Sequence, residues 1–221
     1  MKKSTFFFLA FLLVGWPLIN AVPAWLLPLG PQDLVTSKIA ELYLPTIAVE
    51  WLIFALMLLI LRLEKENLSS ILWRGFTAQN LAIAIAFFFA AGGVLYGAEL
   101  LLPALGLKVD QNFAFLVPKT QTERWWWVAL AVTAGICEEA TYRGYLLTRM
   151  RRFSKSWVTP VMWSSLSFGI AHSYQGKGGV FLIILYSILL SLLFIWRKSI
   201  VPGIIAHSLL DLVQGLYLSG K

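Results

Sequence analysis

Residues 44–61 read LPTIAVEWLIFALMLLIL, an apolar run in which Glu50 is the only charged side chain. A helix that crosses the hydrocarbon core of a bilayer needs about 20 mostly apolar residues. The run is long enough to predict a membrane-spanning helix. Its apolar residues are continuous, which argues against a β-barrel strand, whose residues alternate in polarity.

Six further apolar runs follow the same pattern along the chain. The sequence therefore predicts an all-α fold, a polytopic transmembrane helical bundle of about seven spans. We expect residues 1–221 to form a single integral membrane domain. The six further runs cover about 6–29, 78–105, 125–147, 157–174, 180–196 and 200–218.

The composition supports a membrane protein over a soluble one. Hydrophobic residues make up 59% of the chain and charged residues 13%, whereas a soluble domain carries about 25% charged residues. The net charge of +7 fits basic connections held against anionic lipid, so we expect membrane lipids and no nucleic acid as partners. The single cysteine, Cys137, excludes an intrachain disulfide and a cysteine-based zinc site.

Lys and Arg are distributed unevenly among the connections between the apolar runs. The connections that share a side with the N-terminus carry more of them than the others do. Cytoplasmic loops are enriched in Lys and Arg, so the pattern predicts a cytoplasmic N-terminus. We expect a multi-pass protein of the cell (plasma) membrane.

Two adjacent carboxylates and an arginine lie inside the fourth apolar run. Glu139 and Arg143 are four residues apart, so on a helix they share a face and can pair. Glu138 points about 100° away and is left without that partner. A charge in hydrocarbon needs a partner or a function. An unpaired carboxylate in a low-dielectric site can serve as a general base that activates water.

The two histidines of the chain also lie in apolar runs. His207 and Asp211 are four residues apart, and His172 lies at the end of a different run. A carboxylate beside an imidazole can fix its tautomer, or both can ligate a metal. The other intramembrane carboxylates, Glu50 and Glu99, are interpreted as interface contacts or helix–helix hydrogen bonds.

Three motifs in these runs resemble a known family. Residues 138–143 fit EExxxR, residues 168–172 fit FxxxH and residues 207–211 fit Hxxx(N/D). Their order and their apolar setting resemble the CPBP family of intramembrane proteases, which includes type II CAAX prenyl endopeptidases and bacteriocin-processing, Abi-like proteins. The resemblance covers about residues 125–217, which we interpret as a CPBP-like catalytic core.

The resemblance implies a role for each matching residue. Glu138 matches the base that activates the attacking water, and Glu139 and Arg143 match a pair that orients the site. His172 and His207 match histidines that position water or stabilise the intermediate.

Asp211 stands where the family often has asparagine. An ionised aspartate accepts hydrogen bonds only and cannot donate to an oxyanion. Asp211 could be protonated, a His or Arg could meet the oxyanion instead, Asp211 could orient His207, or it could join a zinc site. If a metal is present, its ligands would be Glu138, His172, His207 and Asp211. Zinc is one option, and a metal-independent mechanism is favoured.

These residues lead to an intramembrane endopeptidase as the main hypothesis. It would hydrolyse peptide bonds of membrane-associated substrates, such as a CAAX-type or leader-peptide segment of a lipid-anchored protein, with water activated by Glu138. The alternative is a non-catalytic membrane immunity or binding protein that retains a vestigial site. A transporter is disfavoured because the polar residues collect in the last hundred positions.

The expected spans leave one geometric problem. At about 1.5 Å per residue, straight helices place Glu138 and His207 on the cytoplasmic half of the membrane. The same count places His172 near the outer end of its span. We therefore expect the fifth span to be short and tilted, or the boundaries around Gly169 to Gly179 to differ, with a broken or re-entrant segment there that lines a watery cavity.

Overall fold

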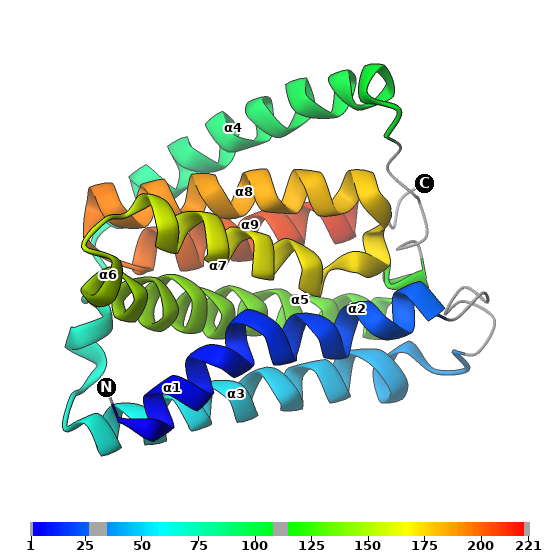
Figure 1. Ribbon diagram of the computed structural model, residues 1–221. Coiled ribbons are helices and arrows are strands. Elements are labelled where there is room, and N and C mark those ends of the chain that lie inside the picture. Colours follow the sequence, from blue (N-terminus) through cyan, green and yellow to red (C-terminus); the bar gives the residue numbers. More distant parts are fainter. Residues whose placement is uncertain (1, 27–34, 108–114, 219–221) are drawn as a thin grey trace.

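The computed structural model describes residues 2–26, 35–107 and 115–218, and these residues form helices and connections without a strand. The all-α prediction is confirmed (Figure 1). In chain order the helices are α1 (Lys3–Ala10), η1 (Phe11–Gly15), α2 (Trp16–Leu26), η3 (Ile39–Tyr43), α3 (Leu44–Glu64), η4 (Leu68–Ile71), α4 (Ala78–Leu101), η5 (Leu102–Leu105), α5 (Gln121–Glu138), η7 (Glu139–Leu147), α6 (Thr148–Ser154), α7 (Val158–Ala171), η8 (Ser173–Gln175), α8 (Gly176–Arg197) and α9 (Val201–Leu218).

Four helical segments in the described part of the chain are long and apolar enough to cross a membrane. They account for four of the seven predicted spans, and the remaining three crossings stay a prediction. Helix α7 is apolar but short. The four segments are Lys3–Leu26, Ile39–Glu64, Ala78–Leu105 and Ser173–Arg197.

The fourth predicted span belongs to a much longer helical rod. It begins at α5 behind a capping box, in which Thr120 accepts from the Glu123 backbone N–H and the Glu123 carboxylate accepts from the Thr120 backbone N–H. The rod continues through the π-helical η7 and ends at Ser154. The helix extends beyond the apolar run, which ends at about residue 147, because the polar segment TRMRRFS of α6 continues it.

The rod passes through the middle of the bundle (Figure 1). Helix α5 packs against α9 and α3, while α7 packs against α8 and α2. A side chain at Gly135 would clash with α9, since a Cβ there would lie 2.9 Å from the Ile204 carbonyl oxygen. The glycine therefore allows α5 and α9 to approach closely.

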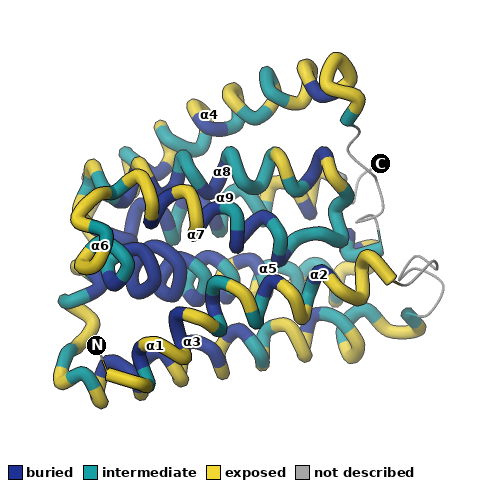
Figure 2. The backbone as a smooth tube through the Cα atoms, viewed as in Figure 1, coloured by how far each residue is buried: buried dark blue, intermediate teal, exposed yellow. Residues whose placement is uncertain are grey.

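Burial is concentrated where the rod meets its neighbours (Figure 2). Every residue of η7 is buried. Side chains from η1, α3, α7 and α8 complete the main apolar core around it, including Leu12, Met57, Phe168 and Phe194. Helix α4 lies at one side of the bundle and is largely exposed, as expected of a helix facing lipid.

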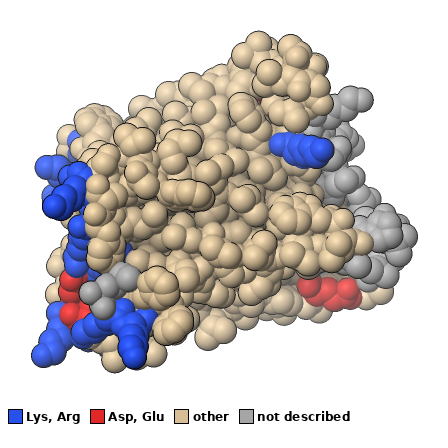
Figure 3. All heavy atoms as spheres, in the orientation of Figure 1, with Lys and Arg blue, Asp and Glu red and all other residues tan. Residues whose placement is uncertain are grey.

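Charged side chains gather at one end of the molecule, near α6 and the start of α1 (Figure 3). The apolar sides of the bundle lie between this end and the opposite one. This distribution fits the predicted cytoplasmic N-terminus, which stays a prediction.

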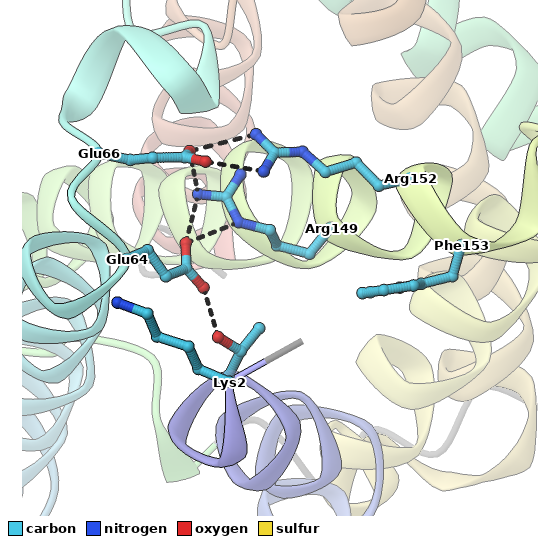
Figure 4. A pocket seen from close by; sticks show the side chains of 7 residues that line it. Lys2, Glu64, Glu66, Arg149, Arg152 and Phe153 are labelled. Atoms are coloured by element: carbon cyan, nitrogen blue, oxygen red, sulfur yellow. Dashed lines mark hydrogen bonds and ion pairs between the residues drawn. The ribbon is translucent and has the colours of Figure 1, made fainter.

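A pocket of about 430 Å³ lies at the charged end (Figure 4). Arg149 binds Glu64 and Glu66 there, with both Nη2–Oε2 distances 2.7 Å, and Arg152 Nη1 lies 2.7 Å from Glu66 Oε1. Thr5 Oγ1 donates to Glu64 Oε1 over 2.7 Å. These ion pairs and this hydrogen bond join α1, the end of α3 and α6.

The length of the rod explains how His172 can lie at the level of Glu138, although straight spans would place it near the outer end of the membrane. At about 1.5 Å per residue, the chain runs roughly 24 Å from Glu138 to Ser154 and returns roughly 20 Å along α7. The two distances nearly match, so His172 returns to the level of Glu138. Helix α7 is short and breaks at His172, as one of the two expected arrangements requires.

Candidate active site

The two adjacent glutamates lie at a change of helix type. Glu138 is the last residue of α5, and Glu139 begins the π-helical η7. π-Helical turns inside α-helices are rare and are frequent at functional sites. Here the change falls within the EExxxR motif and turns Glu139 and Arg143 into the centre of the bundle.

Glu139 and Arg143 form the predicted pair. Arg143 Nη1 donates to Glu139 Oε1 over 2.8 Å, and both side chains are buried. Arg143 Nη2 donates to Ser187 Oγ over 2.9 Å, and the guanidinium carbon lies 4.5 Å from the centre of the Phe168 ring. A buried ion pair is stable only when further hydrogen bonds satisfy both ions. Ser187 and Phe168 supply part of that support.

Helix α9 approaches Glu139 through a glycine. A Cβ at Gly203 would lie 2.9 Å from Glu139 Oε2, which is closer than real Cβ contacts allow. Gly203 therefore leaves the space that the carboxylate occupies. The first turn of α9, which carries the residue, packs directly over the ion pair.

His207 lies among three carboxylates. Its Nδ1 is 3.0 Å from Glu139 Oε1, and its Nε2 is 3.6 Å from both Glu138 Oε2 and Asp211 Oδ2. The hydrogen bond between Nδ1 and Glu139 fixes the orientation of the imidazole ring. It leaves Nε2 facing the carboxylates of Glu138 and Asp211.

Glu138 differs from Glu139 in its surroundings. Its Oε2 atom is buried, and no N–H or O–H group of the described residues donates to it. The side chain keeps 14% of its surface exposed, whereas that of Glu139 keeps 1%. Glu138 is therefore the carboxylate of the pair with an oxygen free to receive a proton.

His172 joins the site through Phe168. Its Nδ1 lies 2.8 Å from the Phe168 carbonyl oxygen, and the two rings are 4.8 Å apart between centres. The Phe168 ring also lies 6.1 Å from the ring of His207. The FxxxH motif thus places one aromatic ring against both imidazoles, and His172 is close enough to His207 to interact electrostatically.

Asp211 is more exposed than Glu138, with 28% of its side chain accessible against 14%. Its carboxylate lies near His207 Nε2, while its backbone oxygen accepts a hydrogen bond from Trp127 Nε1 over 2.9 Å. This hydrogen bond from Trp127 links α5 to α9.

The six predicted residues come together, yet their placement does not form a metal site. No three His, Cys, Asp or Glu side chains in residues 2–26, 35–107 and 115–218 are placed to hold a metal ion. The four proposed zinc ligands do not fit that role as they lie. Zinc dependence stays a prediction that a chelation experiment can test.

Sequence reasoning missed several neighbours of the site. Ser187 is a polar residue in the long apolar run of α8, which was a usable signal. Glu50 was interpreted as an interface contact, but its carboxyl interacts with that of Glu138. Nothing in the local pattern shows which helix such a residue faces, so its partner could not be found from the sequence.

One comparison with known proteins gives a match. Residues 120–213 match the family model described as type II CAAX prenyl endopeptidase Rce1-like. No curated protein and no solved structure matches the chain. The matched segment contains the EExxxR, FxxxH and Hxxx(N/D) motifs and supports a place in the CPBP/CAAX protease family.

Proposed function

From the CPBP/CAAX protease membership that this match supports, we propose that the chain is an intramembrane endopeptidase that uses Glu138 to activate water. Proteases of this family act on prenylated, membrane-associated proteins. The observation that carries the mechanism is the contrast between the two adjacent glutamates. Glu139 is satisfied by Arg143 and His207, whereas Glu138 has a buried oxygen to which no described group donates.

The reaction begins with a water molecule beside Glu138. The carboxylate takes one proton from the water as the oxygen attacks the carbonyl carbon of the scissile peptide. The tetrahedral intermediate carries a negative charge on the former carbonyl oxygen. When the C–N bond breaks, the proton on Glu138 passes to the leaving amine. The products are a carboxylic acid and a free amine.

His207 is placed to stabilise the charge on the intermediate. With both ring nitrogens protonated, Nδ1 donates to Glu139 and Nε2 can donate to the oxyanion. Asp211 stands where relatives often have asparagine. An ionised aspartate accepts hydrogen bonds but cannot donate one to the oxyanion, so Asp211 acts on the intermediate through His207. His172 is the second imidazole of the site and lies against the same Phe168 ring.

The test is cleavage by the full chain purified in detergent. Two fluorogenic peptides serve as substrates, one with a farnesylated CAAX terminus and one identical but unprenylated. Glu138→Ala and Glu138→Gln should lower kcat about 10²- to 10⁴-fold, the usual contribution of a general base. Glu99→Gln is the matched control, because it changes an exposed carboxyl on α4. Retained cleavage by both Glu138 variants would refute the proposal.

A chelator arm addresses the role of metal. We expect wild-type turnover to persist after dialysis against a strong chelator, because the described residues do not form a ligand set. Loss of turnover that added zinc restores would replace the glutamate mechanism by a metal-dependent one. Absence of cleavage by the wild type on either peptide and on a leader-type peptide would favour the non-catalytic alternative.

A further inference from the structure

Glu50 is a buried carboxyl outside the segment that matches the family. It lies in α3, a helix that mostly faces outward, yet only 6% of its surface is exposed. It is the one charged residue between Leu44 and Leu61. A carboxyl held inside an apolar helix needs a partner or a function.

The partner of Glu50 is the proposed general base. Helix α3 packs against α5, and the next residue, Trp51, donates from Nε1 to Thr133 Oγ1 of α5 over 3.3 Å. This contact fixes the register of the two helices. It places the Glu50 side chain within hydrogen-bonding reach of the Glu138 carboxyl.

The chemistry of two carboxyls in contact determines where a hydrogen must lie. An ionised carboxylate can accept hydrogen bonds but cannot donate one. Two ionised carboxylates side by side also repel each other strongly. A stable contact therefore requires that one of the pair carries a hydrogen and donates it to the other.

The remaining neighbours face Glu138 with charge of both signs. Glu138 lies 3.6 Å from His207 Nε2 and interacts with Arg143, whereas Asp211 places a second carboxylate near it. The hydrogen that the contact requires is therefore described as shared by the Glu50–Glu138 pair.

We propose that Glu50 is a positioning residue that shares one hydrogen with Glu138 in a carboxyl–carboxylate hydrogen bond and so holds Glu138 toward the reacting water. The proposal rests on the proposed function of Glu138. It assigns a part of the site to α3, and therefore to the half of the chain that the family match does not cover.

Two variants of similar size distinguish the effect of losing the hydrogen bond at position 50 from the effect of losing side-chain volume. Glu50→Gln keeps a donor, because the amide N–H can take the place of the acid O–H. Glu50→Met keeps the length but has no donor. We expect Glu50→Gln to retain kcat within about 3-fold, and Glu50→Met to lose about 10- to 10²-fold, the cost of a misplaced reacting group. KM should not change in either variant.

Glu99→Met is the matched control, since it removes an intramembrane carboxyl on the exposed side of α4. It should leave kcat and KM unchanged. Equal kcat for Glu50→Met and the wild type would overturn the proposal. So would a Glu50→Gln variant as inactive as Glu138→Gln, because that result would show that the acid group itself is needed in the reaction.

Infrared difference spectra test the pairing without any turnover. The wild-type minus Glu50→Gln spectrum should contain the carbonyl band of a protonated carboxylic acid, and the wild-type minus Glu99→Gln spectrum should lack a band from this buried acid. Absence of the acid band from the first spectrum would overturn the proposal even if Glu50→Met did not fold. A band with no cleavage by the wild type would instead contradict the proposed function and leave the pairing intact.

Discussion

The Nδ1 atom of His207 lies 3.0 Å from the same Glu139 oxygen that accepts a hydrogen bond from Arg143 over 2.8 Å. One carboxylate oxygen therefore serves two positively charged or polar groups from α9 and η7. This shared acceptor connects the ion pair of the EExxxR motif to the histidine of the third motif. It makes Glu139 a structural centre, which leaves Glu138 for the chemistry.

Replacing Glu139 by glutamine should destabilise the fold as well as the site. The substitution leaves Arg143 buried without a charged partner, and breaking a buried ion pair in this way costs about 3–5 kcal/mol. The measurement is the denaturation midpoint in detergent, read together with peptide cleavage. The double variant Glu139→Gln with Arg143→Met should recover part of the lost stability. A single variant as stable as the wild type would contradict the structural role.

Replacing Asp211 by asparagine should preserve most of the turnover. The amide oxygen is an acceptor that can stand in for the carboxylate oxygen, which lies 3.6 Å from His207 Nε2. Asp211→Leu removes the acceptor and should lower kcat about 10- to 100-fold, the usual effect of losing a group that orients a histidine. Comparable losses in the two variants would show that the negative charge, and not the acceptor, is what matters.

Replacing Gly203 by alanine should disturb the site from the far side of Glu139. The new Cβ would stand 2.9 Å from Glu139 Oε2, so the carboxylate or α9 must shift. We expect kcat to fall about 10- to 10²-fold. Gly97→Ala is the control, because no described atom lies within 4 Å of the Cβ it would add. Equal activity of the two variants would mean that Glu139 can move without consequence.

Protonation of Glu66 should weaken the ion pairs at the charged end (Figure 4). The hydrogen bond from Arg152 lowers the pKa of Glu66 from 4.5 to about 2. A carboxyl with a lowered pKa in the folded state stabilises the fold fully above its unfolded value. The stabilisation is lost as the pH falls from about 4.5 toward 2. Melting temperatures across this window should fall more for the wild type than for Glu66→Gln, and parallel curves would contradict the assignment.

Much of the site could be predicted because its chemistry is carried by short motifs. EExxxR and Hxxx(N/D) each place two groups on one helix face, so their pairing follows from helical geometry alone. The contact of Glu139 with both Arg143 and His207 goes further, since it joins two helices. The family resemblance predicted that these motifs share one site, but the contact between Glu139 and His207 was not predicted.

The other features of the fold and the site could not be predicted from the sequence, because they depend on where the helices end and how the helices pack. The apolar run stops near Leu147, but the helix continues to Ser154 because a helix outside the hydrocarbon has no need of apolar residues. That extra length decides where α7 starts and hence where His172 lies. Gly93 and Gly97 are spaced as in many close helix contacts, yet a Cβ added at either would meet nothing within 4 Å in the described residues.

Arg149 forms ion pairs with Glu64 and Glu66. The arginine lies inside the family segment, residues 120–213, whereas both glutamates precede that segment in the chain. Residues 120–213 are therefore not a self-sufficient module. A hybrid that grafts the corresponding segment of a relative onto this N-terminal half must bring a cation at the Arg149 position, or the two acids will face each other uncompensated.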